Sequence, residues 1–337
     1  MLDFFGGTNY LSLSYHPALV AAVTNLVQAG GLGLGASRKT TGTSPAILAL
    51  EEQVARFAGK EEAAVTGSGL SANIAVIEAL AGEVSAWIVD ERAHPTFQNF
   101  VPIGGAKLIR YAHGDAADLR RRLGETSGTV GVFTDGVFPL TGEVAPLAEI
   151  RKALEGREHY LVIDEAHSFG ATGFGACGVA LGLGKAIVTV TFSKALSCTG
   201  GAVLASSEIC ARVRDKSASY SGSSALAPAL CAGVSTALSL IGEAFPRLQA
   251  NMREMREGLA GLPLLGSEGV PIFCVSGDSG IDIAKIHARC LEAGCYVPLI
   301  DAYPGMGASS LLRWIVQADH SREQIRRVRD VIRSLIP

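Results

Sequence analysis

The sequence predicts an α/β protein: a mostly parallel seven-stranded sheet flanked by helices, followed by a smaller α+β domain at the C-terminal end. Through the centre of the chain, short apolar β-rich runs alternate with segments of helical periodicity, which is the pattern of crossover units. After about residue 206 this alternation gives way to long helical segments. With 337 residues, the chain is long enough to form two domains.

Seven runs are the predicted strands of the large sheet, and they lie at residues 63–65, 86–89, 107–111, 129–133, 161–163, 187–190 and 202–204. Helical patterns fit between them, for example over residues 45–58, whose apolar residues approximate one face, and over residues 148–155. The longest apolar region, residues 72–89, is interrupted by one asparagine and two glutamates. It therefore predicts a buried helix followed by a strand, and no membrane span.

The C-terminal part of the chain begins with two predicted helices, over residues 228–241 and 245–262. Predicted strands at residues 270–275 and 311–316 then bracket a helix over residues 281–293. This arrangement is typical of a compact α+β domain.

The composition favours a tightly packed enzyme over a disordered or fibrous protein, since 48% of the residues are apolar and 18% are charged. The net charge is −3, and no long basic run indicates a nucleic-acid partner. The first residues lack the basic and apolar segments of a secretory signal, so we expect a cytoplasmic protein. Seven scattered cysteines without CxxC spacing predict reduced thiols, with no disulfide framework and no metal site, at Cys177, Cys198, Cys210, Cys231, Cys274, Cys290 and Cys295.

Two residues at strand ends carry the first functional signal. Lys194 follows a β-rich run, and Asp164 directly follows the apolar run 160–163, where open α/β sheets place their ligands. Taken singly, Lys194 could be a solvated lysine and Asp164 a helix N-cap. Together they predict a pyridoxal phosphate site, because a lysine amine forms an imine with an aldehyde cofactor and a buried carboxylate holds a pyridine nitrogen protonated.

Small residues between a predicted strand and a predicted helix, at residues 65–73, would suit a phosphate, because free backbone amides and the helix dipole favour an anion there. The alternative is an ordinary strand-to-helix turn. The presence of Lys194 and Asp164 elsewhere in the sequence favours the interpretation as a phosphate site. The glycine-rich run 30–35 has no strand leading into it and no complete GxGxxG pattern. It is interpreted as a substrate-access or interface loop.

Two histidines are candidates for contacts with the cofactor. His94 follows the strand that ends at Val89, and a flat imidazole there can stack on an aromatic ring and exchange a proton. His167 lies three residues beyond Asp164. The alternatives are an ordinary loop histidine at position 94 and a histidine satisfied by backbone carbonyls at position 167.

Several short motifs occur in a specific order, at residues 9–17, 35–38, 42–45, 66–73, 135–138, 145–147, 164–170 and 191–196. In these motifs the chain resembles, over nearly its whole length, the α-oxoamine synthase family of fold-type I pyridoxal phosphate-dependent transferases. The resemblance implies three parts: an N-terminal segment packing with the small domain and the active site, a large cofactor-binding domain and a small α+β domain, at residues 1–39, 40–235 and 236–337.

The resemblance also implies a role for each candidate catalytic residue. Lys194 would carry the internal aldimine and then act as the base that moves the α-proton. Asp164 would pair with the pyridinium, His167 would contact the phenolic oxygen, and His94 would stack over the ring.

The remaining site residues follow from the same resemblance. The cofactor phosphate would be held by Ser68, Gly69, Leu70, Thr191 and Ser193, and by Ser223 and Ser224 from a second subunit. A homodimer with shared active sites is therefore implied. Arg313 matches the family's carboxylate-binding arginine, a task that suits a bidentate guanidinium. Asn9 and Tyr10 are further candidates for substrate contacts.

Some positions depart from the family pattern. Pro139 replaces a serine that lies near the reacting acyl group in the family, and Leu70 replaces an aromatic residue. Ile47 replaces a histidine, and Ser197 replaces a glycine. An N-terminal segment common in the family is expected to be absent. These changes cluster around the expected path of the acyl partner. They leave the residues of the cofactor site unchanged.

The leading hypothesis is an acyltransferase that forms an external aldimine with a small amino acid and condenses its α-carbanion with an acyl-CoA or other acyl thioester, in a decarboxylative Claisen-type reaction. An aldol-type carbon–carbon lyase or an aminotransferase on the same cofactor is the first alternative, because the acyl-side motifs have drifted. A catalytically silent scaffold is the second.

Overall fold

The protein is described by a computed structural model that covers residues 2–172, 183–301 and 310–336. Its central sheet has the strand order β2-β8-β7-β6-β5-β3-β4. Only β8 runs antiparallel to its neighbours, and the other adjacent pairs are parallel. The strands are β2 (Glu62–Thr66), β3 (Ala86–Asp90), β4 (Lys107–Tyr111), β5 (Val130–Asp135), β6 (His159–Asp164), β7 (Ile187–Thr191) and β8 (Gly201–Ala205). The prediction of a mostly parallel seven-stranded sheet is confirmed.

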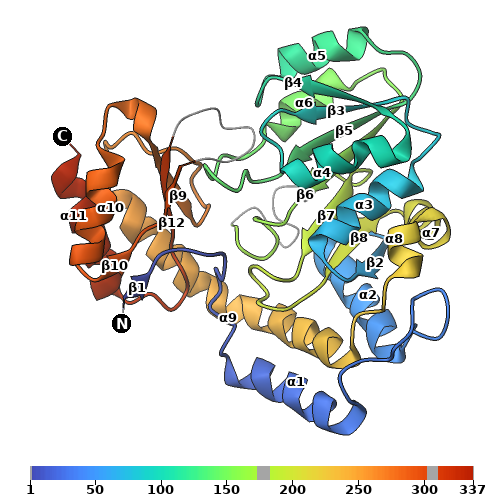
Figure 1. Cartoon of the computed structure of the whole chain (residues 1–337), viewed down its shortest axis with the longest axis horizontal. Helices are drawn as coiled ribbons and strands as arrows, with labels where there is room; N and C mark the ends of the chain where they lie inside the picture. The colour runs from blue at the N-terminus through green and yellow to red at the C-terminus, as the bar shows by residue number, and fades with distance from the viewer. Residues whose placement is uncertain (1, 173–182, 302–309, 337) are drawn as a thin grey trace.

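Helices cover both faces of this sheet (Figure 1). Because side chains alternate along a strand, β3 sends Ile88 into one buried cluster and its neighbours Trp87 and Val89 into the other. The covering elements are α2 (Pro45–Ala58), α3 (Gly69–Ala79), α4 (Pro95–Phe100), η1 (Val101–Gly104), α5 (Ala116–Gly124), α6 (Leu147–Ala153), α7 (Ser207–Lys216) and α8 (Ala218–Gly222). The predicted helix over residues 45–58 coincides with α2.

A glycine in β5 is required by the packing of the neighbouring strand. A Cβ atom added at Gly131 would overlap the indole ring of Trp87. We expect Gly131→Ala to lower the free energy of unfolding by about 1–3 kcal/mol, because the core must shift to admit the methyl group. The control is Gly124→Ala at the end of α5, where an added Cβ meets nothing within 4 Å. Urea unfolding of both variants checks this, and equal stabilities would contradict the packing argument.

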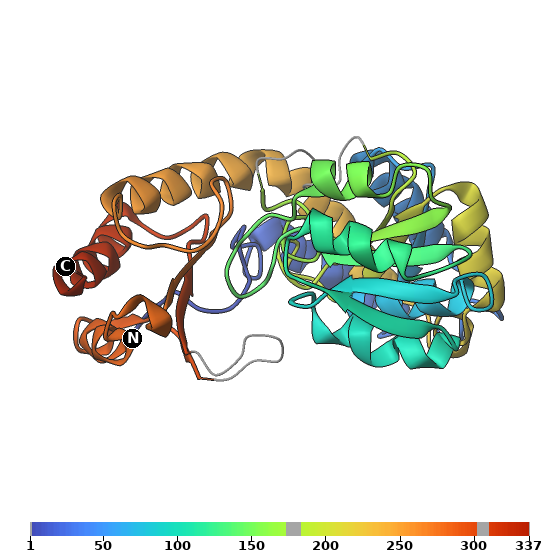
Figure 2. The ribbon, with the colours of Figure 1, turned by 90° about the horizontal axis from the view of Figure 1, so that it is seen from above.

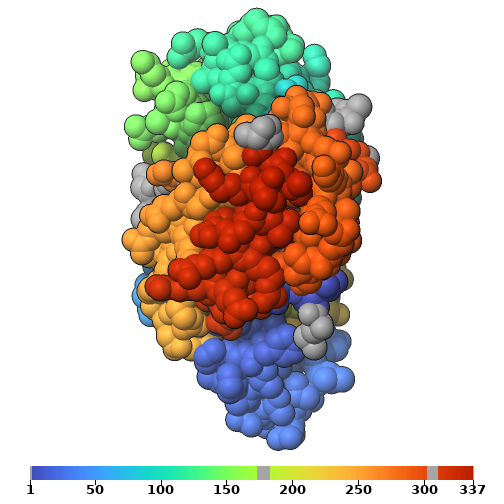
Figure 3. Space-filling model, turned by 90° about the vertical axis from the view of Figure 1, so that its left-hand side faces the viewer, coloured from blue at the N-terminus to red at the C-terminus, as the bar shows by residue number. Residues whose placement is uncertain are grey.

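The C-terminal domain is built on a small antiparallel sheet with the order β11-β12-β9. Its elements are β9 (Ile272–Ser276), η3 (Gly277–Ser279), α10 (Ile283–Glu292), β10 (Cys295–Tyr296), β11 (Leu299–Ile300), β12 (Leu311–Ile315) and α11 (Arg322–Leu335). Figure 3 shows α11 lying between α9 and the α10 region on the outer face. The N-terminal strand β1 (Asp3–Phe4) pairs with β10, which attaches the start of the chain to this domain.

Helix α9 (Pro228–Gly258) is one continuous helix where the sequence predicted two, so that prediction is wrong. Pro246 lies inside it, and a proline removes only one N–H group from the helical ladder. Packing against α1 (Pro17–Gly30), α2 and α11 supports the helix along its length. It runs from the large sheet to the small domain (Figures 1 and 2), so the domain boundary predicted near residue 235 falls inside it.

Within the described part of the chain, α9 is also the one helix whose length and composition would allow it to cross a membrane. The core helix of a soluble protein can have the same length and apolar composition, so these two properties alone do not identify a membrane span. The six cysteines among the described residues are free and buried, and Cys177 lies outside those residues.

Candidate active site

A cavity of about 200 Å³ lies at the edge of the sheet where β5, β6 and β7 end. Its walls are formed by Ser68, Gly69, Leu70, Asn73, His94, Thr96, Asp135, Val137, Asp164, Ala166, His167, Thr191, Ser193 and Lys194. The structure therefore brings together all the predicted site residues except Asn9, Tyr10, Ser223, Ser224 and Arg313. The site consists of segments that are far apart in the sequence.

Asp164 is fixed in the cavity wall by two hydrogen bonds. It ends β6 and is only 9% exposed. Its Oδ2 accepts a hydrogen bond from Asn73 Nδ2 at 2.8 Å, and its Oδ1 accepts one from the Ala166 amide at 2.9 Å. Asn73 is held in turn, because its Oδ1 accepts a hydrogen bond from Thr189 Oγ1 at 2.7 Å. The carboxylate thus has a defined orientation toward any ligand in the cavity.

A second acid, Asp135, lies beside Asp164 because the two residues are paired in the register of β5 and β6. Burial, together with the neighbouring Asp164, raises the pKa of Asp135 well above its ordinary value. The Asp135 carboxyl accepts the backbone N–H of His94 at 3.1 Å. This environment favours the neutral acid at position 135.

Lys194 and His167 contact each other in the wall of the cavity. Lys194 Nζ lies 2.6 Å from His167 Nε2, and the Tyr10 hydroxyl lies 2.7 Å from His167 Nδ1. Burial lowers the pKa of Lys194 to about 8, although Asp164 opposes the shift. Burial and the Lys194 cation lower the pKa of His167 well below its ordinary value, so its ring is neutral and offers one donor and one acceptor to its two partners. The amine at position 194 is therefore more often in its nucleophilic form than an exposed lysine amine.

The start of α3 closes one end of the cavity. Ser68 caps the helix: its Oγ accepts the Ser71 N–H at 3.1 Å, and Ser71 Oγ accepts the Ser68 N–H at 2.9 Å. Gly69 follows, and a Cβ there would lie 2.9 Å from the Cβ of Thr191. Thr191 Oγ1 and Ser193 Oγ are 2.8 Å apart on the other side. Hydroxyl groups and the positive end of a helix thus face one another, an arrangement that suits a phosphate.

His94 is held with its ring at the cavity. It is the N-cap of α4, and its Nδ1 lies 2.7 Å from Thr96 Oγ1. Burial lowers the pKa of His94. A neutral, fixed imidazole of this kind is suited to stacking on a flat ring.

Arg313 and Tyr10 do not line the cavity, although Tyr10 contacts the lining residue His167. Arg313 is in β12 and 7% exposed, and its Nε donates a hydrogen bond to the Pro139 carbonyl at 2.7 Å. Burial raises the pKa of Tyr10 to about 12, while the nearby Arg313 guanidinium opposes this rise. Arg313 is therefore connected to His167 through Tyr10.

Asn9 supports the turn that follows Lys194. Its Oδ1 accepts a hydrogen bond from Ser197 Oγ at 2.6 Å. Ser197 has a φ of 54°, in the left-handed region that favours glycine, which accounts for the glycine expected at this position from the family resemblance. The contact with Asn9 gives the serine a partner in that conformation.

Ser223 and Ser224 are exposed and do not line the cavity. Ser223 Oγ donates a hydrogen bond to the Ser219 carbonyl at 2.5 Å, and Ser224 forms a backbone bridge with Ser37. Their predicted contribution to a second subunit's site stays a prediction.

Two further residues of this site, Asn73 and Asp135, have no role among the expectations drawn from the sequence. Asp135 shows the same signal as Asp164, an acid directly after a buried apolar strand, and could have been found by it. Asn73 is a buried amide in an otherwise apolar stretch of α3. Its partner Asp164 is distant in sequence, so only the fold reveals the contact.

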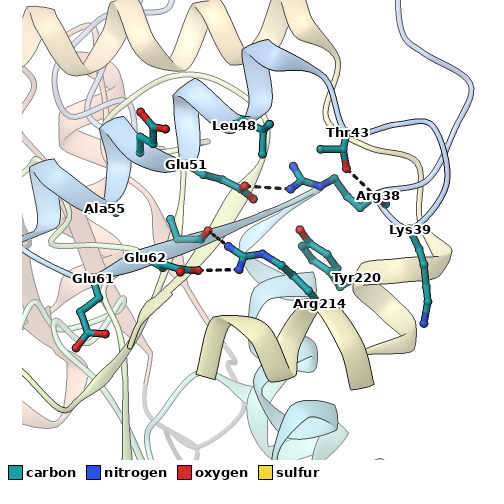
Figure 4. A pocket seen from close by; sticks show the side chains of 12 residues that line it. Arg38, Lys39, Thr43, Leu48, Glu51, Ala55, Glu61, Glu62, Arg214 and Tyr220 are labelled. Carbon is teal, nitrogen blue, oxygen red and sulfur yellow. Dashed lines mark hydrogen bonds and ion pairs between the residues drawn. The ribbon is translucent and has the colours of Figure 1, made fainter. Parts of the chain in front are cut away.

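A wider hollow of about 590 Å³ lies beside α2 and β2 (Figure 4). Its charged groups pair within the wall, with Arg38 bonded to Glu51 at 3.0 Å and Arg214 to Glu62 at 2.7 Å. The lysine in its wall, Lys39, is exposed, so this hollow does not offer the buried amine that the smaller cavity has.

Comparison with known proteins points to one family. The family model for aminotransferase class I and II matches residues 5–332. A putative 8-amino-7-oxononanoate synthase of Phenylobacterium zucineum (strain HLK1) is 36% identical, over 95% of this chain and 84% of its own. The serine palmitoyltransferase of Caulobacter vibrioides (strain NA1000 / CB15N) is 31% identical, over 95% of this chain and 82% of its own.

Solved structures give the same result. A serine palmitoyltransferase variant from S. paucimobilis, with a bound PLP-myriocin aldimine, superposes with a TM-score of 0.89. It is 27% identical and covers 99% of this chain and 88% of its own. A serine palmitoyltransferase with a PLP internal aldimine superposes with a TM-score of 0.88, at 27% identity and with the same coverage of 99% and 88%.

Proposed function

Because the chain belongs to the α-oxoamine synthases of the aminotransferase class I and II family, we propose that it is a pyridoxal phosphate-dependent acyltransferase that joins the α-carbon of a small amino acid to the acyl group of a thioester such as an acyl-CoA. One observation carries the proposal. A buried amine at Lys194, a fixed carboxylate at Asp164 and the N-terminal end of α3 share one cavity.

The residues of this cavity fit the cofactor. Pyridoxal phosphate has an aldehyde, a ring nitrogen and a phosphate, and each has a matching group in the wall: Lys194, Asp164 and the hydroxyl groups beside Gly69. When bound, the cofactor withdraws electrons from the α-carbon of an attached amino acid. Leu70 lines the same cavity and would add its backbone to the phosphate contacts.

Protein groups would supply the proton transfers and the orientation. Lys194 would hold the cofactor and then move the proton at the α-carbon, with a pKa near 8 suited to that exchange. Asp164 would keep the ring nitrogen protonated, and neutral His167 would contact the phenolic oxygen. His94 would stack over the ring.

The substrate carboxylate would be bound by Arg313, whose planar guanidinium can make two parallel hydrogen bonds. This contact would set which bond of the α-carbon stands perpendicular to the cofactor ring and therefore breaks. Tyr10 would support the binding of this substrate through its contact with His167, and Asn9 through its contact with Ser197.

We further propose a cytoplasmic homodimer with no membrane span and no nucleic-acid partner. Ser223 and Ser224 would reach the phosphate of the partner's site, which is consistent with their exposure and with their absence from the cavity wall of their own chain. Large exposed side chains near the N-terminus also favour a subunit contact, with Tyr15 91% exposed and Leu32 84% exposed.

The rate of cofactor uptake should depend on the ionisation of Lys194. Its pKa of about 8 lies below the ordinary value of 10.5. The neutral amine attacks the aldehyde, so we expect uptake by the apo-enzyme to slow as the pH falls through 8 and to level off above it. Stopped-flow absorbance between pH 6 and 10 measures this. A rate of uptake that still rises steeply between pH 9 and 10 would contradict the burial argument.

A substrate screen tests the reaction class. The holoenzyme is incubated with glycine, alanine or serine and with short, medium and long acyl-CoAs, and free thiol is measured. We expect thiol release only when both substrates are present. Keto acid or aldehyde formation without thiol release would instead establish an aminotransferase or a carbon–carbon lyase. A protein that binds no cofactor would contradict both.

A further inference from the structure

A turn at residues 137–144 of the large domain makes contacts with the small domain. The turn is closed by a backbone bridge between Val137 and Val144. Its Gly142 carbonyl accepts the Ser267 N–H at 3.0 Å, and the Val144 N–H donates to Ser267 Oγ at 3.0 Å. Gly142 has a φ of 76°, and a Cβ there would lie 2.9 Å from the Ile272 carbonyl oxygen. The turn therefore packs closely on the small domain.

The same turn holds Arg313 in place. Arg313 Nε donates to the carbonyl of Pro139 at 2.7 Å, and both groups are buried. Leu140, the next residue, packs in a buried cluster with Cys274 and Leu311, which flank Arg313 in the small sheet. The position of the guanidinium thus depends on where this turn lies.

His113 fixes the turn from the side of the large sheet. Its Nδ1 lies 3.0 Å from Asp90 Oδ1, at the buried end of β3, and its Nε2 lies 3.4 Å from Glu143 Oε2 in the turn. The edge of its ring contacts the Phe138 ring, with centroids 4.3 Å apart. Asp90 is itself fixed, since it accepts the N–H groups of Arg92 and Gly114 at 2.9 Å each.

The ionisation of His113 agrees with this bridge. Burial acts to lower its pKa, but the hydrogen bonds to Asp90 and Glu143 dominate and raise it to about 9. The ring is therefore an imidazolium at neutral pH: its Nδ1 donates a hydrogen bond to Asp90, and its Nε2 forms an ion pair with Glu143. The hydrogen bond from His113 also lowers the pKa of Glu143.

We propose that His113 is a positioning residue for substrate binding: by bridging Asp90 and Glu143 it fixes the 137–144 turn, whose Pro139 carbonyl orients Arg313 toward the carboxylate of the amino-acid substrate. This inference rests on the proposed function, because it assumes that Arg313 binds that carboxylate. His113 itself lies outside the cavity wall. We therefore expect the loss of His113 to weaken binding of the amino acid while leaving cofactor binding unchanged.

The test separates the two halves of the bridge. An asparagine amide can replace the Nδ1 contact of a histidine but does not reach as far as Nε2, so His113→Asn keeps Asp90 paired and releases Glu143. We expect its KM for the amino acid to rise about tenfold. The visible absorbance of the bound cofactor should stay within about twofold of wild type, because His113 does not line the cavity.

Glu143→Ala removes the carboxylate in the turn that pairs with His113. It should also raise the KM for the amino acid about tenfold. The double variant should be no worse than Glu143→Ala alone, because that variant already removes the contact with His113 together with the 3.7 Å ion pair between Glu143 and Arg92. The matched control is His159→Asn, an exposed histidine at the opposite end of the sheet, which should change nothing.

An amino-acid KM unchanged in His113→Asn and Glu143→Ala would overturn the inference. A double variant about a hundredfold impaired would do so as well, because the two effects would then be independent. If His113→Asn fails to fold, the KM of Glu143→Ala for the amino acid tests the inference by itself, because Glu143 is partly exposed and its replacement should be tolerated. A wild-type enzyme that releases no thiol with any amino acid would overturn the proposed function and this inference with it.

Discussion

Replacing Lys194 by alanine is expected to abolish covalent cofactor attachment and to lower kcat by at least about 10²–10⁴-fold, because one side chain would hold the cofactor and move the α-proton. The fold should survive. Burial disfavours the Lys194 cation, as its pKa of about 8 shows, so its removal costs the folded state little. Steady-state kinetics together with the visible spectrum measure both effects.

Lys185→Ala provides the control for this variant, since Lys185 is exposed just before β7 and should be dispensable. A Lys194→Ala enzyme that keeps its visible absorbance after dialysis, and its activity within tenfold of wild type, would contradict the assigned role.

The second large effect should distinguish the two neighbouring acids. We expect Asp164→Asn to lower kcat by about 10²–10³-fold. A neutral amide cannot keep the pyridine nitrogen of the cofactor protonated, and the cofactor then withdraws electrons from the substrate less strongly. Asp135→Asn should lower kcat by less than about fivefold. Burial raises the pKa of Asp135 and favours its neutral acid, which an amide replaces with little change of shape or charge.

Both variants can be compared under saturating cofactor, with folding checked by circular dichroism. Equal losses in the two variants would show that Asp164 has no special relation to the cofactor. A larger loss in Asp135→Asn would reverse the assignment of roles.

Much of the large domain could be predicted from the sequence because its signals are local. Buried parallel strands are short apolar runs, and all seven predicted runs fall in the central sheet. Asp164 could be identified because a carboxylate directly after such a run contradicts the apolar pattern. Its position at the binding edge then follows from the parallel topology.

Other features depend on contacts that no local pattern records. The two helices predicted over residues 228–241 and 245–262 form one helix, because contacts with three other helices keep α9 continuous through Pro246. Asn73 meets Asp164, and His113 meets Glu143, across long separations in the chain. Arg313 was assigned only by resemblance, because its relation to Tyr10 and Pro139 is created when the small domain packs on the large one.

The central claim is that Lys194 holds pyridoxal phosphate in the cavity at the end of the sheet. Reduction of the holoenzyme with borohydride, followed by proteolysis and mass spectrometry, tests it most directly. We predict a phosphopyridoxyl group on the peptide that contains Lys194 and on no other lysine. A reduced cofactor attached to a different lysine, or a protein that carries none after reduction, would contradict the claim.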